Sequence, residues 1–347
     1  MIVLGIETSC DETSVAVLDG EGRVRSNVIS SQIRAHALYG GVVPEVAARA
    51  HLENLPVALE DALEIAGTRL EDVGLVAATA GPGLIGALLV GLSAGKALAF
   101  ARGKPLVPVN HLEGHLFSAY LRPGGEAALP VAYPFHGLVV SGGHAELVRV
   151  EDGVIVPLAR TRDDAPGEAF DKIARRAGLG YPGGPGGERV AARGDGSRFP
   201  FAIGRTRDGS RDFSFSGLKT AMLRELQRRG IDGSPLEPES LDAELVDLLA
   251  SFQHAIVATL LDRVASVHAS EGMRELALSG GVAANTELRA ALAAWGQGHG
   301  VPVRLPDRAF TTDNAAMIAW AGLLRFRRDG AGDLWQANAR SRWPLGT

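Results

Sequence analysis

Short apolar segments separated by polar or glycine-rich turns run through the first hundred residues and predict a sheet covered by helices. Four strands are expected, at residues 2–7, 14–19, 24–30 and 73–80. Apolar residues recur at helical spacing after Pro44 and again from Leu84 to Phe100, which predicts two long helices. Strands alternating with helices in this way are typical of an α/β fold.

The same order of elements begins again beyond Pro108. The expected elements are a helix at residues 111–121 and strands at 135–141, 145–150 and 276–278. A glycine pair follows two of these strands, at Gly142-Gly143 and at Gly280-Gly281, and the second pair leads into a predicted helix. Two halves that both open with a strand, a turn and a strand indicate a duplicated α/β unit with a ligand cleft between the copies.

The composition is that of a soluble globular protein, and 347 residues are enough for two domains. Hydrophobic residues make up 46% of the chain, and the single cysteine, Cys10, fits a reducing cytosol. Glycines and Lys96 interrupt the longest apolar stretch, so none reaches the ~20 residues of a membrane span. The N-terminus lacks the regions of a signal peptide. We therefore expect a cytoplasmic protein without a membrane segment.

The charge is distributed unevenly along the chain. The whole chain has a net charge of −5, but residues 157–232 contain 15 Lys and Arg against 10 Asp and Glu, which gives this segment +5. Such a basic segment could contact a phosphate backbone. An arginine-rich solvated surface explains it equally well, because Arg outnumbers Lys by 31 to 4 throughout the chain.

His111 and His115 are candidate metal ligands. Side chains four residues apart lie on one face of a helix, so both imidazoles could reach one metal ion. Asp313, at the start of an apolar helix, would complete a set of two imidazoles and one carboxylate, which suits iron and also zinc. The alternative for Asp313 is an ordinary helix cap, and for the histidines an ordinary place on a helix.

Three polar or glycine-rich turns are candidate sites for an anion. They are residues 8–13, Ser141-Gly142-Gly143 and Ser279-Gly280-Gly281, and each follows a predicted strand. Exposed backbone N–H groups in such turns, and at the helix N-terminus after the third, favour negative charge. Three turns of this kind in one chain indicate a nucleotide-like ligand.

Nine stretches in order resemble the TsaD family of bacterial tRNA N6-adenosine threonylcarbamoyltransferases, formerly described as O-sialoglycoprotein endopeptidases. They are residues 7–14 (ETSCDETS), 40–46 (GGVVPEV), 111–115 (HLEGH), 140–144 (VSGGH), 167–172 (GEAFDK), 181–185 (YPGGP), 213–220 (FSFSGLKT), 280–285 (GGVAAN) and 312–314 (TDN). The resemblance runs essentially from end to end.

The resemblance implies an actin-like, sugar-kinase and Hsp70 type of fold (ASKHA) with two related RNase H-like domains. We expect one domain at residues 1–108, joined by the C-terminal helix of about 325–347, and a second at 109–324 that carries the metal and adenylate sites. The implied reaction moves threonylcarbamoyl from threonylcarbamoyl-AMP to N6 of the adenosine 3′ to the anticodon, in tRNAs that read codons beginning with A. AMP is released. TsaB-like and TsaE-like subunits are the implied partners.

The resemblance also implies roles for particular residues. By position in the matching stretches, the metal ligands are His111, His115 and Asp313, with Fe²⁺ as the expected ion and Zn²⁺ as the alternative. Glu12 is implied as a polar participant near the reacting carbonyl. The residues implied to bind the adenylate, or an ATP- or ADP-like nucleotide, are Val139, Val140, Ser141, Gly142, Gly143, Asp171, Gly184 and Asn285.

Three other functions compete with the transferase. A zinc metalloprotease needs the pattern HExxH, but Leu112 stands beside the first histidine and Glu113 points about 100° further round the helix. A small-molecule kinase of the same fold has no need of a histidine pair. A non-catalytic nucleotide-binding subunit has no need of one either, and bacterial relatives of that kind are shorter.

Overall fold

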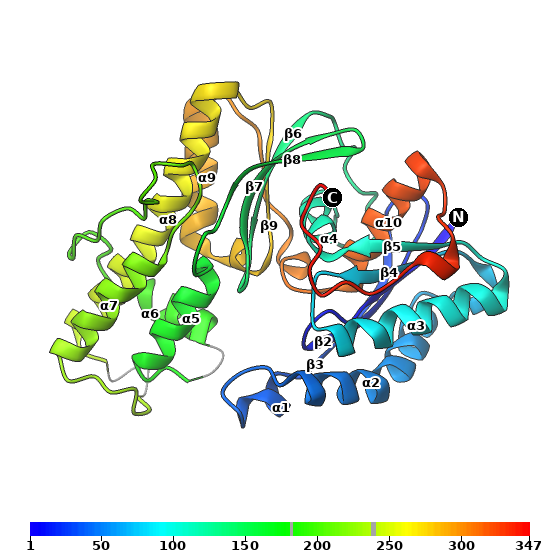
Figure 1. Ribbon diagram of the computed structural model, residues 1–347, viewed down its shortest axis with the longest axis horizontal. Coiled ribbons are helices and arrows are strands. Elements are labelled where there is room, and N and C mark those ends of the chain that lie inside the picture. The colour runs from blue at the N-terminus through cyan, green and yellow to red at the C-terminus, as the bar shows by residue number, and fades with distance from the viewer. Residues whose placement is uncertain (181–182, 237–240) are drawn as a thin grey trace. The chain divides into compact units, whose positions relative to one another are not determined.

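The computed structural model describes residues 1–180, 183–236 and 241–347, which form two compact units (Figure 1). Unit 1 consists of Met1–Tyr133, Glu151–Ile155 and Pro306–Thr347. Unit 2 consists of Pro134–Val150 and Val156–Leu305. Unit 1 is therefore discontinuous in sequence, and most of unit 2 lies between its two main parts.

Unit 1 contains a five-stranded sheet in the order β3-β2-β1-β4-β5. Its strands are β1 Ile2–Glu7, β2 Glu12–Leu18, β3 Val24–Ser31, β4 Val73–Gly81 and β5 Leu106–Asn110. Strand β2 is antiparallel to both β1 and β3, while β4 is parallel to both β1 and β5. The central strands consist of apolar, mostly β-branched or small residues because both faces of this sheet are covered.

Helices cover both faces of this sheet. The helices of unit 1 are α1 Ile33–Ala37, α2 Pro44–Ile65, α3 Ile85–Arg102, α4 His111–Ser118 and α10 Ala315–Asp329. Leu4 and Ile6 share a buried cluster with residues of α2 and α3, whereas Gly5 between them faces α10. Since successive residues of a strand point to opposite faces, α10 lies on the other side of the sheet from α2 and α3.

Unit 2 repeats this topology. Its sheet has the order β10-β9-β6-β7-β8, which is the order of unit 1 with the strands renumbered from β6. The strands are β6 Phe135–Val140, β7 Ala145–Glu151, β8 Val154–Arg160, β9 Leu276–Ser279 and β10 Val303–Arg304. As in unit 1, the first two strands, β6 and β7, are antiparallel, and β9 is parallel to both β6 and β10. The predicted duplicated α/β unit is thereby confirmed.

Unit 2 contains five α-helices among its described residues. They are α5 Pro166–Arg176, α6 Gly183–Ala191, α7 Ser216–Arg228, α8 Ala243–Glu271 and α9 Thr286–His299. By length and composition alone, α8 and α3 could each cross a membrane. Most of α8 is buried in the core of unit 2, and α3 packs on β4. Packing in a folded core therefore accounts for the apolar character of α8, and for that of one side of α3.

The predicted domain boundaries are corrected by this division. Residues 109–133 and 306–324 were expected in the second domain, but they pack in unit 1, because α10 contacts β1, β2, β4 and β5 and also contacts α4. The metal-ligand candidates therefore lie in unit 1 instead of with the adenylate candidates. Strand β5 was not predicted, since Pro108 interrupts it; an edge strand tolerates a proline.

Candidate functional site

Helix α4 begins where β5 ends, and Asn110 fixes the junction. The Asn110 side-chain oxygen accepts hydrogen bonds from the backbone N–H groups of Leu112 (2.9 Å) and Glu113 (3.4 Å), which is the arrangement of an N-cap. His111 and His115 then lie one turn apart, with ring centroids separated by 4.7 Å. The sequence thus places both imidazoles on one face, as their spacing predicts.

Asp313 joins the two histidines. Its Oδ1 lies 3.0 Å from Nε2 of His115 and 3.5 Å from Nε2 of His111, and one potential ligand atom from each residue lies within 4.8 Å of the others. The cap of α10 is Asn314, whose Oδ1 accepts from the Met317 N–H. The capping alternative therefore does not apply to Asp313, and its carboxylate faces the histidines.

Glu7 and Ser9 hold the other side of the His111 ring. Nδ1 of His111 lies 3.1 Å from Glu7 Oε2 and 3.1 Å from Ser9 Oγ. Glu7 is fully buried, and the Thr79 hydroxyl donates to it at 2.6 Å. A carboxylate on one ring nitrogen directs the lone pair of the other nitrogen towards a metal. Sequence reasoning missed this role, although an acid ending an apolar buried strand is itself unusual.

The cluster strongly favours positive charge. Burial alone would lower the pKa of His111, but the carboxylates of Asp313 and Glu7 outweigh it and raise that pKa to about 9. Burial, followed by the charges of Asp313 and Asp11, raises the pKa of Glu12 to about 9. Burial also raises the pKa of the Cys10 thiol, which stays protonated. Several acids around one small volume would be stabilised by a cation.

The donor set fits a divalent transition metal. Two imidazole nitrogens and one carboxylate oxygen are ligands that iron and zinc both accept, and three protein ligands leave open positions for a substrate. Nδ1 of His115 is buried and has no hydrogen-bond partner among the described residues, so only His111 has the supporting carboxylate. The geometry of residues 111, 115 and 313 therefore supports the metal prediction.

A C-terminal segment packs behind this helix start. The Asn110 side-chain amide donates to the carbonyl of Trp343 at 3.0 Å, and the Arg340 N–H donates to the carbonyl of Ala80 at 2.7 Å. Trp343 is only 8% exposed and belongs to the apolar cluster on which α2 and α3 pack. The segment thus connects the core of unit 1 to the residue that caps α4.

Replacing Trp343 with alanine should destabilise unit 1 by about 3 kcal/mol, the usual cost of deleting a buried tryptophan. It should also increase hydrogen exchange of the Leu112 and Glu113 amides, because loss of the buried indole loosens the backbone whose carbonyl holds Asn110. Urea unfolding and exchange mass spectrometry measure the two effects. Trp335→Ala is the control: this residue is 67% exposed and contacts Phe100, so its loss should cost less than about 1.5 kcal/mol. Equal effects would contradict a structural role for Trp343.

The adenylate candidates all lie in unit 2. Val139 and Val140 are buried at the end of β6, and Ser141 accepts the His144 N–H in the following turn. A Cβ added to Gly142 or Gly143 would meet no atom within 4 Å, so the backbone of this turn faces open space. Gly280, with φ +88°, passes so close to Val140 that a Cβ would lie 2.4 Å from its carbonyl oxygen. Glycine is therefore required there for packing.

Asp171 and Gly184 meet at the start of α6. Oδ1 of Asp171 accepts from the N–H groups of Gly183 (2.6 Å) and Gly184 (3.2 Å). The neighbouring Tyr181 and Pro182, part of one stretch used for the family resemblance, lie outside the described residues. Asp171 thus already occupies a helix N-terminus, where it orients the glycine backbone.

Asn285 caps α9 and is held by α8. Its Oδ1 accepts from the Leu288 N–H at 2.9 Å, and its amide donates to Gln253 at 2.9 Å. Asn285 and Gln253 also line a small apolar cavity of about 40 Å³ together with Phe170. This cavity adjoins α5, the helix that carries Asp171, so the two candidates lie in one part of unit 2.

Comparisons with known proteins give the sequence similarity of this chain to the TsaD family. The sequence model of the TsaD family, described as tRNA N6-adenosine threonylcarbamoyltransferase, matches residues 23–320. Relatives given that name from Agrobacterium fabrum and Symbiobacterium thermophilum are 47% and 48% identical, covering 99% and 98% of this chain and 94% and 93% of their own.

A solved structure shows the fold over nearly the whole chain. The activator of the 2-hydroxyisocaproyl-CoA dehydratase from Clostridium difficile, with bound ADPNP, aligns with 96% of this chain and 99% of its own at a TM-score of 0.51 and 12% identity. The ASKHA fold predicted from the sequence is confirmed. Because the family model and the relatives span the two units and the histidine–aspartate cluster, this chain belongs to the TsaD family of tRNA N6-adenosine threonylcarbamoyltransferases.

Proposed function

We propose that this protein transfers threonylcarbamoyl from threonylcarbamoyl-AMP to N6 of the adenosine 3′ to the anticodon, in tRNAs that read codons beginning with A. Membership of the TsaD family along the whole chain carries this proposal. The convergence of His111, His115 and Asp313 favours it over a small-molecule kinase, which has no need of such a cluster. Leu112 in place of a general base continues to disfavour a metalloprotease.

The proposed metal site consists of His111, His115 and Asp313, with Fe²⁺ as the proposed ion and Zn²⁺ as the alternative. When bound, the ion would supply Lewis-acid polarisation to the threonylcarbamoyl group. Glu7 and Ser9 contact Nδ1 of His111 and so leave its Nε2 free to bind the ion. Glu12 is proposed as a polar participant near the reacting carbonyl, supported by its electrostatic coupling to Asp313.

The proposed chemistry needs little nucleophilic activation by the protein. The N6 amine attacks the carbamoyl carbon, a C–N bond forms, and AMP leaves with the electrons of the broken C–O bond while N6 loses a proton to the solvent. Because the acyl adenylate is already activated, binding and orientation are the main tasks of the chain. In unit 2 we assign binding of the adenylate to Val139–Gly143, Asp171, Gly184 and Asn285, supported by the open glycine turn after β6.

We further propose a TsaB-like and a TsaE-like subunit as partners, with tRNA as the substrate and the cytoplasm as the location. Exposed apolar side chains on α2 and α3 give a protein partner a surface to bury, including Leu52, Ile65, Leu89 and Phe100. No partner is needed to complete the histidine–aspartate cluster, since all its residues come from this chain.

Nucleoside mass spectrometry tests the reaction. Unmodified tRNA is incubated with this protein, its partner subunits and threonylcarbamoyl-AMP, and threonylcarbamoyladenosine is the expected product. Failure with partners shown to be active in a reference system would overturn the transferase. Sugar-dependent ATP turnover would then support a kinase, and cleavage of a glycoprotein by the pure protein would support a protease.

Asp171→Ala is expected to raise the KM for threonylcarbamoyl-AMP about 10-fold or more while leaving the metal content unchanged. The reason is that Gly183 and Gly184 lose the carboxylate that orients their N–H groups, and misplacement of a binding group by about 1 Å can cost up to ~100-fold. Initial rates against adenylate concentration measure the effect. Asp208→Asn, in an exposed turn of the same unit, is the control and should keep the wild-type KM. A normal KM for Asp171→Ala would remove this residue from the adenylate site.

A further inference from the structure

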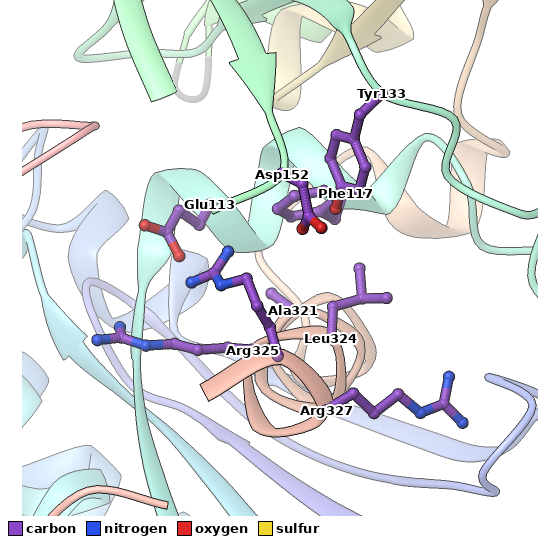
Figure 2. Close-up of a pocket in the computed structure, with 9 residues that line it drawn as sticks. Glu113, Phe117, Tyr133, Asp152, Ala321, Leu324, Arg325 and Arg327 are labelled. Carbon is purple, nitrogen blue, oxygen red and sulfur yellow. The ribbon is translucent and has the colours of Figure 1, made fainter. Parts of the chain in front are cut away.

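Besides the small cavity in unit 2, a pocket lies in unit 1 between α4 and α10 (Figure 2). It has a volume of about 260 Å³, below the ~300–1,000 Å³ of pockets that hold drug-sized ligands. Its floor is α10, and the opposite wall contains Glu113 and Phe117 of α4 together with Tyr133 and Asp152. All these residues belong to unit 1. The size suits a small metabolite.

This pocket is separate from the histidine–aspartate cluster. Glu113 lies two positions from each histidine, and two steps of about 100° place it about 200° round the helix from both. The histidines therefore face one side of α4 and Glu113 faces the other. A ligand in the pocket would not contact the proposed metal ligands.

Two of the three arginines at the pocket already have partners. Arg327 donates to the carbonyl of Gly20, and Figure 2 shows its side chain leading away from Glu113. Arg328 donates to both carboxylate oxygens of Asp329 at 2.7 and 2.9 Å. Arg327 is therefore held at the turn after β2, and Arg328 is paired with a neighbouring residue of its own helix.

Arg325, Glu113 and Asp152 remain with unused hydrogen-bonding capacity. Arg325 makes one hydrogen bond among the described residues, from Nη1 to the carbonyl of Pro108 at 3.2 Å, and a guanidinium has five N–H donors. Within the described part of the chain, neither Glu113 nor Asp152 forms a hydrogen bond through its carboxyl group or an ion pair within 4 Å. The pocket thus presents one available cation and two available carboxyl groups across an open space.

We propose that this pocket binds a zwitterionic α-amino acid with an aliphatic side chain. A phosphate or another simple anion would face two carboxyl groups, and a simple cation would face Arg325. A zwitterion satisfies both, because Arg325 can bind its carboxylate while Glu113 and Asp152 accept hydrogen bonds from its ammonium group. Phe117, Ala321 and Leu324 provide an apolar wall for the side chain.

Isothermal titration of the full chain with L-leucine and L-valine tests the proposal, and it needs neither tRNA nor adenylate. Leucine amide and N-acetyl-leucine, each lacking one charge, are titrated in parallel. We expect saturable binding of at least one amino acid and at least a 10-fold weaker Kd for both analogues of leucine if leucine is the ligand. Absence of saturable heat with both amino acids, or binding of the analogues as tight as that of leucine, would overturn the proposal.

Variants locate the binding in this pocket. Arg325→Gln and Asp152→Asn should each weaken the Kd at least 10-fold, and Arg327→Gln, whose side chain leads away, should leave it unchanged. Arg325→Gln also removes a contact to Pro108 and could disturb β5. Asp152 lies on a turn and makes no such contact, so Asp152→Asn tests the pocket independently. Thermal unfolding confirms that each variant is folded. Unchanged binding in both Arg325→Gln and Asp152→Asn would overturn the proposed location.

Discussion

Replacing His111 and His115 together with alanine is expected to abolish metal binding and to lower transferase activity at least about 100-fold. Removal of even an outer partner of a metal ligand typically costs 10–100-fold in metal affinity or activity, and this variant removes two of three ligands. Elemental mass spectrometry of the purified protein and initial rates of threonylcarbamoyladenosine formation measure the two effects.

Two further variants sharpen this prediction. Glu7→Gln leaves all three ligand side chains in place but replaces the carboxylate that orients His111 with a neutral amide, so metal affinity should fall about 10–100-fold. His299→Ala removes a histidine of unit 2 that stacks on Trp295, and its metal content should stay at the wild-type level. Full metal content and activity in the double histidine variant would refute the metal site.

Gly5→Ala is expected to destabilise unit 1 strongly. A Cβ at this position would lie 2.3 Å from the Ala315 carbonyl oxygen and 2.9 Å from the Ala319 Cβ, where α10 crosses the sheet. Because the clash is with helix backbone, α10 must move or the strand must bend. Overpacking of this kind costs typically 1–3 kcal/mol and occasionally more, and we expect the upper end, about 3 kcal/mol.

Thermal unfolding measures this effect, and the metal content of the folded fraction shows whether α10 has shifted Asp313. Gly298→Ala is the matched control: it lies in a helix, a Cβ there meets nothing within 4 Å, and alanine is the better helix former. A wild-type melting temperature for Gly5→Ala would mean that β1 and α10 approach less closely than described.

Local periodicity predicted most of the strands and helices, but it did not predict how they assemble. Strands β1 to β4 and helices α2 and α3 follow from apolar spacing, whereas the short helix α1 was missed, and β5 was missed because Pro108 breaks the pattern. The placement of α10 in unit 1 depends on contacts with strands about three hundred residues earlier, for example between Ser14 and Ala315. No pattern within a short window contains such a contact.

In the candidate site, too, local spacing predicted some features, while others depend on long-range contacts. The spacing of His111 and His115 predicted a shared face, while the nearness of Asp313 depends on the tertiary fold. The contact of Glu7 on β1 with His111 on α4 is also a long-range outcome, whereas the capping of α10 by Asn314 is a local interaction that sequence reasoning considered for Asp313 instead. The roles of the adenylate candidates stay predictions, although the structure brings Asp171 to Gly184 and leaves the turn at Gly142 open.

The discontinuity of unit 1 has a consequence for synthesis of the protein. His115 and Asp313 are 198 residues apart, and all of unit 2 is translated between them. At ~5–20 residues per second, roughly 10–40 s pass between the two residues on the ribosome. During that time α10 is absent from the sheet of unit 1, while unit 2 can already fold. The three side chains can therefore meet only after unit 2 has been made, and shorter nascent chains carry two imidazoles without the carboxylate.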